Sequence, residues 1–369
     1  FWVVAASAAA PALAYGVARA ALRAVGEAWS ARAPAAAADA ATTQNLGVVV
    51  TGCDSGFGRD AAIELCARGY AVFAGCLRDP RQSGWLAGVG AELVGRPGAT
   101  LPRGLLLDVT RQEHVDRAAH VVDEWLAGDA ARRLVAVVNN AGVATAGLCE
   151  WLAADDLRKD LEVNYLGVHR VARAFLPLLK EARCRGATTP KPRLVVVASM
   201  ASRCAMPAAA SYAASKHAVL GYAASLAAEV AADVDVCVVE PSFHRTPMVA
   251  GDAALESFDR AWREFRNTRK KRPSSSSMSA DHDTAADAAE YEAYAQLRRL
   301  VPARARQFAW HPDLVVDVLV DVVTSATAPP FEIPVGVDAR YFLQVLRRLP
   351  SWITQRAARD WWLPPSSSS

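Results

Sequence analysis

The chain has 369 residues, of which 52% are hydrophobic and 21% are charged, and its formal net charge is +3. This length holds one large domain or two ordinary ones, and so large a hydrophobic fraction excludes general disorder. The small net charge and the scattered Lys and Arg predict no nucleic-acid partner, and the histidines lack the spacing of a metal site.

Residues 1–44 form a hydrophobic leader that ends in an alanine-rich linker. Phe1 to Ala18 carries no charge and approaches the ~20 apolar residues that cross a bilayer, although Pro11 interrupts it. Three interpretations stay open: a truncated membrane anchor, an organelle transit segment, and a loose amphipathic leader. Membrane association, at the endoplasmic reticulum or the mitochondrion, is the localisation that this segment favours.

In residues 45–250, apolar β-branched runs alternate with helical patterns, as parallel sheets with helices on both faces require. The predicted strands are Leu46–Thr51, Ala71–Cys76, Gly104–Asp108, Leu134–Asn139, Arg193–Ser199 and Val234–Glu240. The predicted helices are Gly58–Arg68, Gln112–Leu126, Ala153–Arg183 and Tyr212–Ala232. The expected fold class is α/β, a doubly wound parallel sheet of about seven strands in one domain. Right-handed crossovers place the site along the carboxyl ends of the strands.

The regular pattern weakens after Pro247, and residues 251–369 are expected to form a substrate lid and a C-terminal tail. Phe258, Trp262 and Phe265 lie at i, i+4 and i+7 of a predicted helix. Such spacing puts the three rings on one face of the helix. Packing in the core explains this spacing at least as well as contact with a substrate.

Residues 268–289 are rich in Ser, Asp and Ala, which predicts a disordered insertion. Its basic cluster, Arg269–Arg272, is interpreted as part of a solvated loop. The helical pattern resumes in Tyr291–Leu300 and Pro312–Ala326. The remaining tail is apolar and basic, and its aromatic residues fit a membrane interface and core packing equally well.

A glycine-rich turn, Thr51-Gly-Cys-Asp-Ser-Gly-Phe-Gly58, joins the first predicted strand to the first predicted helix. Gly52 permits the tight turn, Gly56 lets the backbone approach a pyrophosphate, and Gly58 allows close packing of the helix. Free amides at the start of that helix favour negative charge. Asp54 is interpreted as a helix cap rather than as a contact to the substrate. The turn therefore predicts a dinucleotide cofactor.

Tyr212 and Lys216 lie four residues apart in a predicted helix, and Ser199 lies thirteen residues before the tyrosine. Residues i and i+4 share a helix face, so the Lys216 ammonium is expected beside the Tyr212 phenol. Lowering a phenol pKa from about 10 to about 7 takes roughly 4 kcal/mol, and a nearby cation supplies much of it. The spacing therefore predicts proton transfer at Tyr212.

The glycine turn, the serine and the tyrosine–lysine pair, in this order, resemble the short-chain dehydrogenase/reductase family over about Leu46 to Met248. The variant T-G-C-D-S-G-F-G is similar to the branch of retinol dehydrogenases, hydroxysteroid dehydrogenases and animal D-3-hydroxybutyrate dehydrogenase. The resemblance implies a catalytic tetrad: Asn164, Ser199, Tyr212 and Lys216. It also implies that Ser199 and Tyr212 bind the substrate oxygen.

The resemblance implies a nicotinamide dinucleotide cofactor as well. The residues implied to bind it are those that match the family's motifs, Tyr212 and Lys216 included: Thr51, Gly52, Asp54, Ser55, Gly56, Phe57, Gly58, Arg78, Asp108, Val109, Asn140, Ala141, Gly142, Pro241 and Thr246. Ser242 replaces the usual glycine, which would shift the nicotinamide if that position required positive φ.

The choice between NAD and NADP depends on the end of the second strand. An acid there selects NAD and a nearby Arg accepts a 2′-phosphate. No acid stands near Cys76, and Arg78 and Asp79 follow it. Because the run Val72–Leu77 resembles NAD-using members, NAD is slightly favoured and NADP stays open.

The expected activity is the interconversion of an alcohol and a carbonyl by hydride transfer, on a lipophilic substrate such as a retinoid or hydroxysteroid. D-3-hydroxybutyrate is the alternative, because Ser199–Pro207 resembles that enzyme; its carboxylate would need a cation such as Arg203 or Arg245. A non-catalytic nucleotide-binding scaffold is a third interpretation, which the complete tetrad disfavours. The resemblance also implies a homodimer or homotetramer, with the Asn164 and Tyr212 helices at the interface.

Overall fold

The structure is a computed structural model that describes residues 43–185, 190–250, 252–270, 280–307, 309–336, 339, 350, 352 and 353. The predicted leader therefore lies outside the described residues, except for Thr43 and Gln44, and so does most of the predicted aromatic tail. In the part of the chain that is described, every helix is too short or too polar to cross a bilayer.

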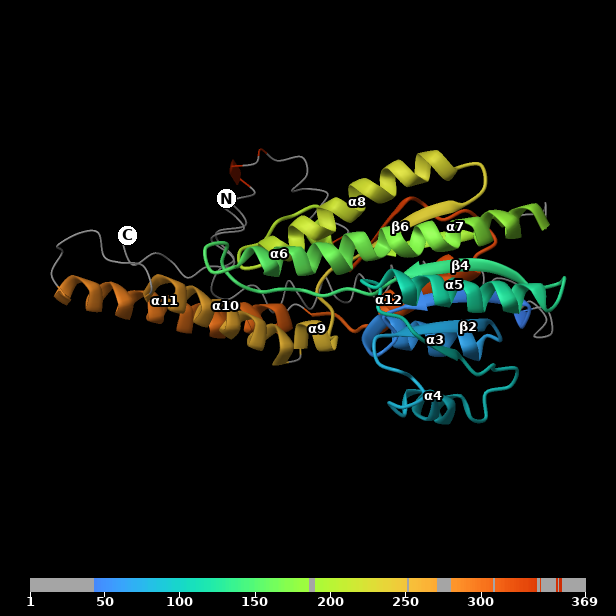
Figure 1. Ribbon diagram of the computed structural model, residues 1–369, viewed down its shortest axis with the longest axis horizontal. Helices are drawn as coiled ribbons and strands as arrows, with labels where there is room; N and C mark the ends of the chain where they lie inside the picture. Colours follow the sequence, from blue (N-terminus) through green and yellow to red (C-terminus); the bar gives the residue numbers. More distant parts are fainter. Residues whose placement is uncertain are drawn as a thin grey trace, which may run out of the picture. The chain divides into compact units, whose positions relative to one another are not determined.

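A seven-stranded sheet in the order β3-β2-β1-β4-β5-β6-β7 forms the centre of the fold (Figure 1). The strands are β1 Leu46–Thr51, β2 Ala71–Cys76, β3 Arg103–Leu106, β4 Arg133–Asn139, β5 Arg193–Val197, β6 Asp235–Pro241 and β7 Glu332–Val335. Every neighbouring pair of these strands is parallel. The strand order reverses between β1 and β4, which places a ligand crevice at their carboxyl ends. The predicted doubly wound α/β fold is confirmed.

The helices that follow the strands cover both faces of the sheet (Figure 1). The helices of the described residues are α3 Gly56–Ala67, α4 Trp85–Leu93, α5 Gln112–Ala127, α6 Ala154–Leu161, α7 Gly167–Arg185, α8 Ala210–Val230, α9 Pro247–Ala250, α10 Asp252–Lys270, α11 Ala280–Gln307 and α12 Asp313–Thr324. One core lies between the sheet and α3, α4 and α12, and the other lies between the sheet and α5, α7 and α8. Because both faces are covered, the strands are mostly apolar, and β2 and β5 are buried at every residue, Arg193 of β5 included.

The helix predicted over Ala153–Arg183 is divided in two. A π-helical turn, Glu162–Leu166, separates α6 from α7 and contains Asn164. Such turns are rare and occur frequently at functional sites. Asn164 therefore lies in a kind of turn that is typical of functional sites.

Of the α-helices and strands described, α4, the four-residue α9 and β7 were not predicted. The sequence of α4 includes Gly88 and Gly90, which lower helix propensity. Strand β7 has four residues and includes Pro334, which an edge strand tolerates. Both signals are too weak to read without their packing partners.

The segment predicted to be disordered is helical where the structure describes it. Thr268–Lys270 continue α10 and Ala280–Ala289 begin α11, whereas residues 271–279 lie outside the described ranges. Residues 280–289 are rich in alanine and contain neither Gly nor Pro, so their helix propensity is high. Composition that suggested disorder is equally compatible with a solvated helix.

A cluster of aromatic side chains joins α10 and α11 to the segment that follows β4. Phe258 and Trp262 of α10 are buried and pack with Trp151 and Tyr294. The rings of Trp262 and Tyr294 are stacked, with centroids 4.8 Å apart. These rings therefore form a smaller core of their own, separate from the two cores that flank the sheet.

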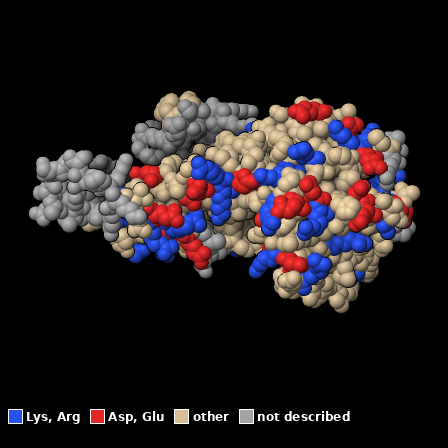
Figure 2. All heavy atoms as spheres, in the orientation of Figure 1, with Lys and Arg blue, Asp and Glu red and all other residues tan. Residues whose placement is uncertain are grey.

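On the face that Figure 2 shows, acidic and basic side chains are interspersed over the surface.

Arg193 of β5 is the largest of the fully buried side chains. Its guanidinium donates hydrogen bonds to the carbonyl oxygens of Val322, Val323, Ser325 and Thr327. These carbonyls lie at and just beyond the C-terminus of α12, where a cation is favourable. Arg193 therefore connects α12 to the middle of the sheet.

Replacing Arg193 by Met should lower the free energy of unfolding by about 3 kcal/mol, because buried carbonyl groups lose a charged donor. Equilibrium urea unfolding measures this change. Arg117→Met, at an exposed position of α5, is the matched control and should be nearly neutral. A loss below about 1 kcal/mol at Arg193 would show that these hydrogen bonds contribute no more than average ones.

Candidate active site

The loop between β1 and α3 has the geometry of a cradle for a dinucleotide. Gly52 and Gly56 have φ of 71° and 61°. A Cβ on Gly58 would come within 2.4 Å of Asn140 Nδ2, so only glycine fits there. Ser55 is the N-cap of α3, and in this fully described helix its side chain makes no capping hydrogen bond. The amides at the start of α3 are thus left for an anion such as a pyrophosphate.

Thr51 holds the ends of β1 and β4 together. Its hydroxyl accepts hydrogen bonds from the amides of Asn140 and Ala141, both at 3.0 Å. The Asn140 side chain in turn donates to the carbonyl oxygens of Thr51 at 2.9 Å and Gly52 at 3.2 Å. A Cβ on Gly142 would lie 3.2 Å from Asn164 Oδ1 and 3.6 Å from Lys216 Nζ. Thr51, Asn140 and Gly142, which were predicted to bind the cofactor, therefore lie together at the carboxyl ends of β1 and β4, where the strand order reverses.

Two buried polar atoms at this edge support the fit of a dinucleotide. Among the side chains that the structure describes, Asn139 Nδ2 and Ser242 Oγ are buried without a hydrogen-bond partner. Asn139 ends β4, and Ser242 follows Pro241 at the end of β6. Unpaired buried polar atoms are costly, so a bound group that pairs with them is favoured.

The segment after β6 keeps a relaxed backbone although Ser242 replaces the usual glycine. Of the described residues other than glycine, Ala208 alone has a positive φ. Thr246 lies against the glycine loop, because a Cβ on Gly56 would be 3.7 Å from its side chain. The ring of Phe57 also contacts the ring of His244 edge to face, with centroids 5.5 Å apart. Thr246 is thus positioned beside the cradle, and Pro241 ends β6, without strain at Ser242.

The prediction that Asp54 caps α3 is wrong. The helix begins one residue later than that interpretation requires, with Ser55 as its N-cap. The Asp54 carboxylate accepts hydrogen bonds from the amides of Leu77 at 2.7 Å and Arg78 at 3.2 Å. Asp54 therefore joins the glycine loop to the residues that follow β2.

Asp108 and Val109 lie beyond the third strand rather than at its end, because β3 ends at Leu106. The Asp108 carboxylate accepts hydrogen bonds from the Thr110 amide at 2.9 Å and the Thr110 hydroxyl at 2.8 Å. Val109 is buried and would meet a Cβ on Gly167 at 2.7 Å. Asp108 thus stabilises its own turn at the carboxyl edge of the sheet.

Ser199, Tyr212 and Lys216 come together between β5 and α8. Ser199 follows β5, and hydrogen bonding to its side chain lowers the pKa of the Tyr212 phenol. Lys216 is 4% exposed. Its Nζ lies 5.7 Å from the centroid of the Tyr212 ring and donates to the carbonyl oxygen of Val197 at 2.9 Å. The side chains predicted to move a proton are therefore neighbours.

The pKa values of Tyr212 and Lys216 are dominated by burial. Burial raises the pKa of Tyr212 to about 12, although the hydrogen bond from Ser199 opposes this and part of the ring is exposed. Burial also lowers the pKa of Lys216 to about 8. In each case the neutral form is favoured. The prediction that Lys216 brings the Tyr212 pKa to about 7 is thus not met by these side chains alone.

Asn164 connects the loop after β4 to α8. Its Oδ1 accepts from the Val143 amide at 2.9 Å, while its Nδ2 donates to the Val143 carbonyl at 2.8 Å and to Ser215 Oγ at 2.9 Å. Ser215 then donates to the carbonyl oxygen of Tyr212 at 2.7 Å. Asn164 therefore positions the first turn of α8, on which Tyr212 stands.

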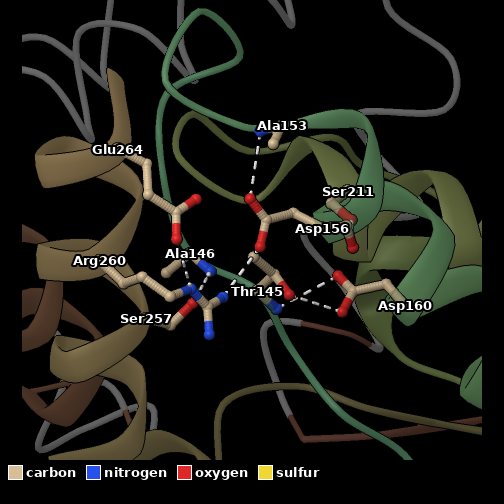
Figure 3. Close-up of polar contacts among 9 residues, drawn as sticks. All are labelled: Thr145, Ala146, Ala153, Asp156, Asp160, Ser211, Ser257, Arg260 and Glu264. Atoms are coloured by element: carbon tan, nitrogen blue, oxygen red, sulfur yellow. Dashed lines mark hydrogen bonds and ion pairs between the residues drawn. The ribbon is translucent and has the colours of Figure 1, made fainter. Parts of the chain in front are cut away.

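Asp160 is a charged neighbour of the tetrad that sequence reasoning missed. It is fully buried and accepts hydrogen bonds from the Thr145 amide at 3.2 Å and hydroxyl at 2.8 Å (Figure 3). Its negative charge raises the pKa of both Tyr212 and Lys216. For Lys216, this opposes the effect of burial. The sequence feature that could have indicated this role is the position of Asp160, one helical turn before Asn164 and on the face of α6 that packs against α8.

Polar contacts also hold the predicted lid against α6. Arg260 of α10 donates to Asp156 Oδ1 at 2.8 Å, and Asp156 Oδ2 accepts from the Ala153 amide at 3.1 Å (Figure 3). Nearby, Ser257 Oγ accepts from the Ala146 amide at 3.3 Å. Helix α10 is therefore attached to the segment that leads from Gly142 into α6.

The two arginines considered as partners of a substrate carboxylate are engaged elsewhere. Arg203 donates to Glu240 Oε1 at 2.8 Å and forms an ion pair with Glu332 at 2.5 Å. Arg245 donates to the carbonyl oxygen of Ala309 at 3.2 Å. Two carboxylates thus compensate Arg203, and a third would compete with them.

Several known proteins resemble this chain over about three fifths of its length. It is 36% identical over 223 residues to human 17-beta-hydroxysteroid dehydrogenase type 6, covering 60% of this chain and 64% of that protein. It is 36% identical over 225 residues to human retinol dehydrogenase 5, covering 59% and 63%. For the bovine mitochondrial D-beta-hydroxybutyrate dehydrogenase the identity is 34% over 222 residues, covering 59% and 60%. The chain thus spans less than two thirds of each of these relatives.

Two solved structures of short-chain dehydrogenases have the same fold, one in complex with NAD and the other in complex with NADP. The Burkholderia phymatum protein in complex with NAD matches with a TM-score of 0.59 and 21% identity, covering 87% of this chain and 97% of that one. The Burkholderia cenocepacia protein in complex with NADP matches with a TM-score of 0.54 and 22% identity, covering 87% and 98%. Residues 47–256, more than half of the chain, match the family described as short chain dehydrogenase. This protein belongs to the short-chain dehydrogenase family.

Proposed function

We propose that the protein is an NAD(P)-dependent oxidoreductase that interconverts an alcohol and a carbonyl. The observation that carries this proposal is that Ser199, Tyr212 and the buried Lys216 come together between β5 and α8, with Lys216 Nζ 5.7 Å from the centroid of the Tyr212 ring. A nicotinamide dinucleotide supplies hydride transfer when it is bound. The glycine loop, with the free amides of α3, and the Asn140–Gly142 turn are the parts of this chain that would hold it.

The side chains of the site would move the proton that accompanies hydride transfer. The Tyr212 hydroxyl exchanges that proton with the substrate oxygen, and Ser199 donates a hydrogen bond to the same oxygen. A phenol with a raised pKa is protonated at neutral pH, which suits donation to a carbonyl. Oxidation of an alcohol needs the phenolate instead, so its rate should increase with pH.

A lipophilic alcohol, such as a retinoid or a hydroxysteroid, is the substrate class that the observations favour. Two of the relatives are named for retinol and for a hydroxysteroid. The third is named for hydroxybutyrate, which carries a carboxylate. Because Arg203 is compensated by Glu240 and Glu332, a cation for that carboxylate is not ready in this site. Hydroxybutyrate therefore remains the less favoured alternative.

A substrate screen tests this proposal. The purified full chain is incubated with retinol, a panel of hydroxysteroids or 3-hydroxybutyrate, each with NAD and with NADP, and nicotinamide reduction is followed by absorbance. Turnover of retinol or a hydroxysteroid is the expected result. Turnover of 3-hydroxybutyrate alone would refute the lipophilic class, and no turnover of any alcohol would refute the dehydrogenase proposal.

We also propose a homodimer or homotetramer whose interface involves α7 and α8. A groove of about 490 Å³ between these helices supports this proposal, since its wall includes the apolar or aromatic side chains of Leu176, Pro177, Tyr222 and Leu226.

Membrane association at the endoplasmic reticulum or the mitochondrion is a separate proposal. The uncharged Phe1–Ala18 segment supports it, and the bovine relative is named as mitochondrial.

A further inference from the structure

The end of β2 lacks a charged residue where dinucleotide-binding folds distinguish NAD from NADP. In these folds an acid near the end of the second strand binds the adenosine ribose hydroxyls and selects NAD. Strand β2 ends instead in Cys76, which is 1% exposed. Burial raises the pKa of this thiol to about 12, so it is neutral at physiological pH. Discrimination by charge must come from another residue.

Asp54 brings a carboxylate to this place from the neighbouring glycine loop. Its two oxygens accept the amides of Leu77 at 2.7 Å and Arg78 at 3.2 Å, the first two residues after β2. An ionised carboxylate has about four acceptor positions, of which these bonds use two. The side chain is 23% exposed, so the remaining acceptor positions are accessible from solvent.

Arg78 is the cation that would otherwise attract a 2′-phosphate. Its Nε lies 3.8 Å from Asp54 Oδ1, and its side chain is 77% exposed. A phosphate would therefore have to replace Asp54 as the partner of this guanidinium. It would also approach the Asp54 carboxylate itself, which carries the same sign of charge.

We propose that Asp54 is the residue by which this chain selects NAD over NADP. Its carboxylate accepts hydrogen bonds from the ribose hydroxyls of NAD and repels the 2′-phosphate of NADP. In this way a residue of the glycine loop performs the role that the end of the second strand usually performs. The inference rests on the proposed function only in requiring that a nicotinamide dinucleotide binds.

Binding measurements without any alcohol test Asp54 independently of the substrate proposal. Dissociation constants of NAD and NADP are measured by calorimetry for the full chain and for Asp54→Asn, which keeps one oxygen acceptor. The unsubstituted protein should bind NAD more tightly. Asp54→Asn should lower the preference for NAD, the ratio of the NADP dissociation constant to the NAD dissociation constant, by about tenfold or more. This is the low end of the effect of a nearby like charge. Most of that change should be tighter binding of NADP.

Asp79→Asn is the matched control, because it removes a carboxylate from the neighbouring loop after β2 that is hydrogen-bonded to Arg81 instead. Asp54→Ser is measured in parallel, so that one poorly folded variant does not decide the result. The proposal is overturned if the unsubstituted protein binds NADP more tightly than NAD. It is also overturned if both Asp54 variants keep the ratio of the two dissociation constants within about twofold of the original value, or if Asp79→Asn lowers that ratio as much as the Asp54 variants do. A failure of every alcohol to turn over would leave these binding results unaffected.

Discussion

Replacing Tyr212 by Phe should lower kcat/KM by about 10²–10⁴-fold, the usual contribution of an acid or base at the reacting oxygen. The substitution removes a single hydroxyl and keeps the ring beside Lys216. Affinity for the dinucleotide should therefore change little. Initial rates with the best substrate of the screen and calorimetric binding of NAD provide the two measurements.

Tyr222→Phe is the matched control for this experiment. Tyr222 stands on the same helix, and its hydroxyl is 3.3 Å from His169 Nδ1 rather than in the site. Loss of that hydroxyl should leave kcat/KM nearly unchanged. If Tyr212→Phe retained more than about a tenth of the original rate, another group would have to be the acid/base.

The strands at the centre of the sheet were predictable because their local pattern and their environment agree. Strands of a sheet covered on both faces are apolar at nearly every position; β2 meets this requirement along its whole length, and β5 meets it after Arg193. The glycine loop was predictable for a similar reason. The tight turn at Gly52 and the close approach at Gly58 each exclude a side chain, so the residue type itself reports the geometry.

The contacts that depend on distant partners were not predictable from one sequence. Asp54 looks like a helix cap locally, yet its partners Leu77 and Arg78 come from the next strand connection. Asp160 looks like a solvated acid, and its burial becomes visible only when Thr145 and α8 are in place. The π-helical turn at Asn164 likewise follows from the paired hydrogen bonds to Val143, which no helical periodicity records.

Replacing Lys216 by Met should reduce kcat/KM by about 10²-fold or more, because the cation beside the Tyr212 phenol is lost. The loss should not come from unfolding. Burial lowers the Lys216 pKa from 10.5 to about 8, so the unfolded chain binds more protons between these pH values and stability rises with pH there. Below that window the buried ammonium costs stability, and Met removes this cost. The unfolding midpoint of Lys216→Met at pH 7 should therefore equal or exceed that of the unsubstituted protein.

The pH profile separates an electrostatic role of Lys216 from a merely structural one. Oxidation of an alcohol requires the Tyr212 phenolate, so the rate of the unsubstituted protein should rise with pH. Below about pH 8, where Lys216 is an ammonium, its loss makes the phenolate less stable, so the rise should move to higher pH by about one unit or more. If the rate falls but the profile stays in place, Lys216 serves only to hold the loop through Val197, and another group must stabilise the Tyr212 phenolate.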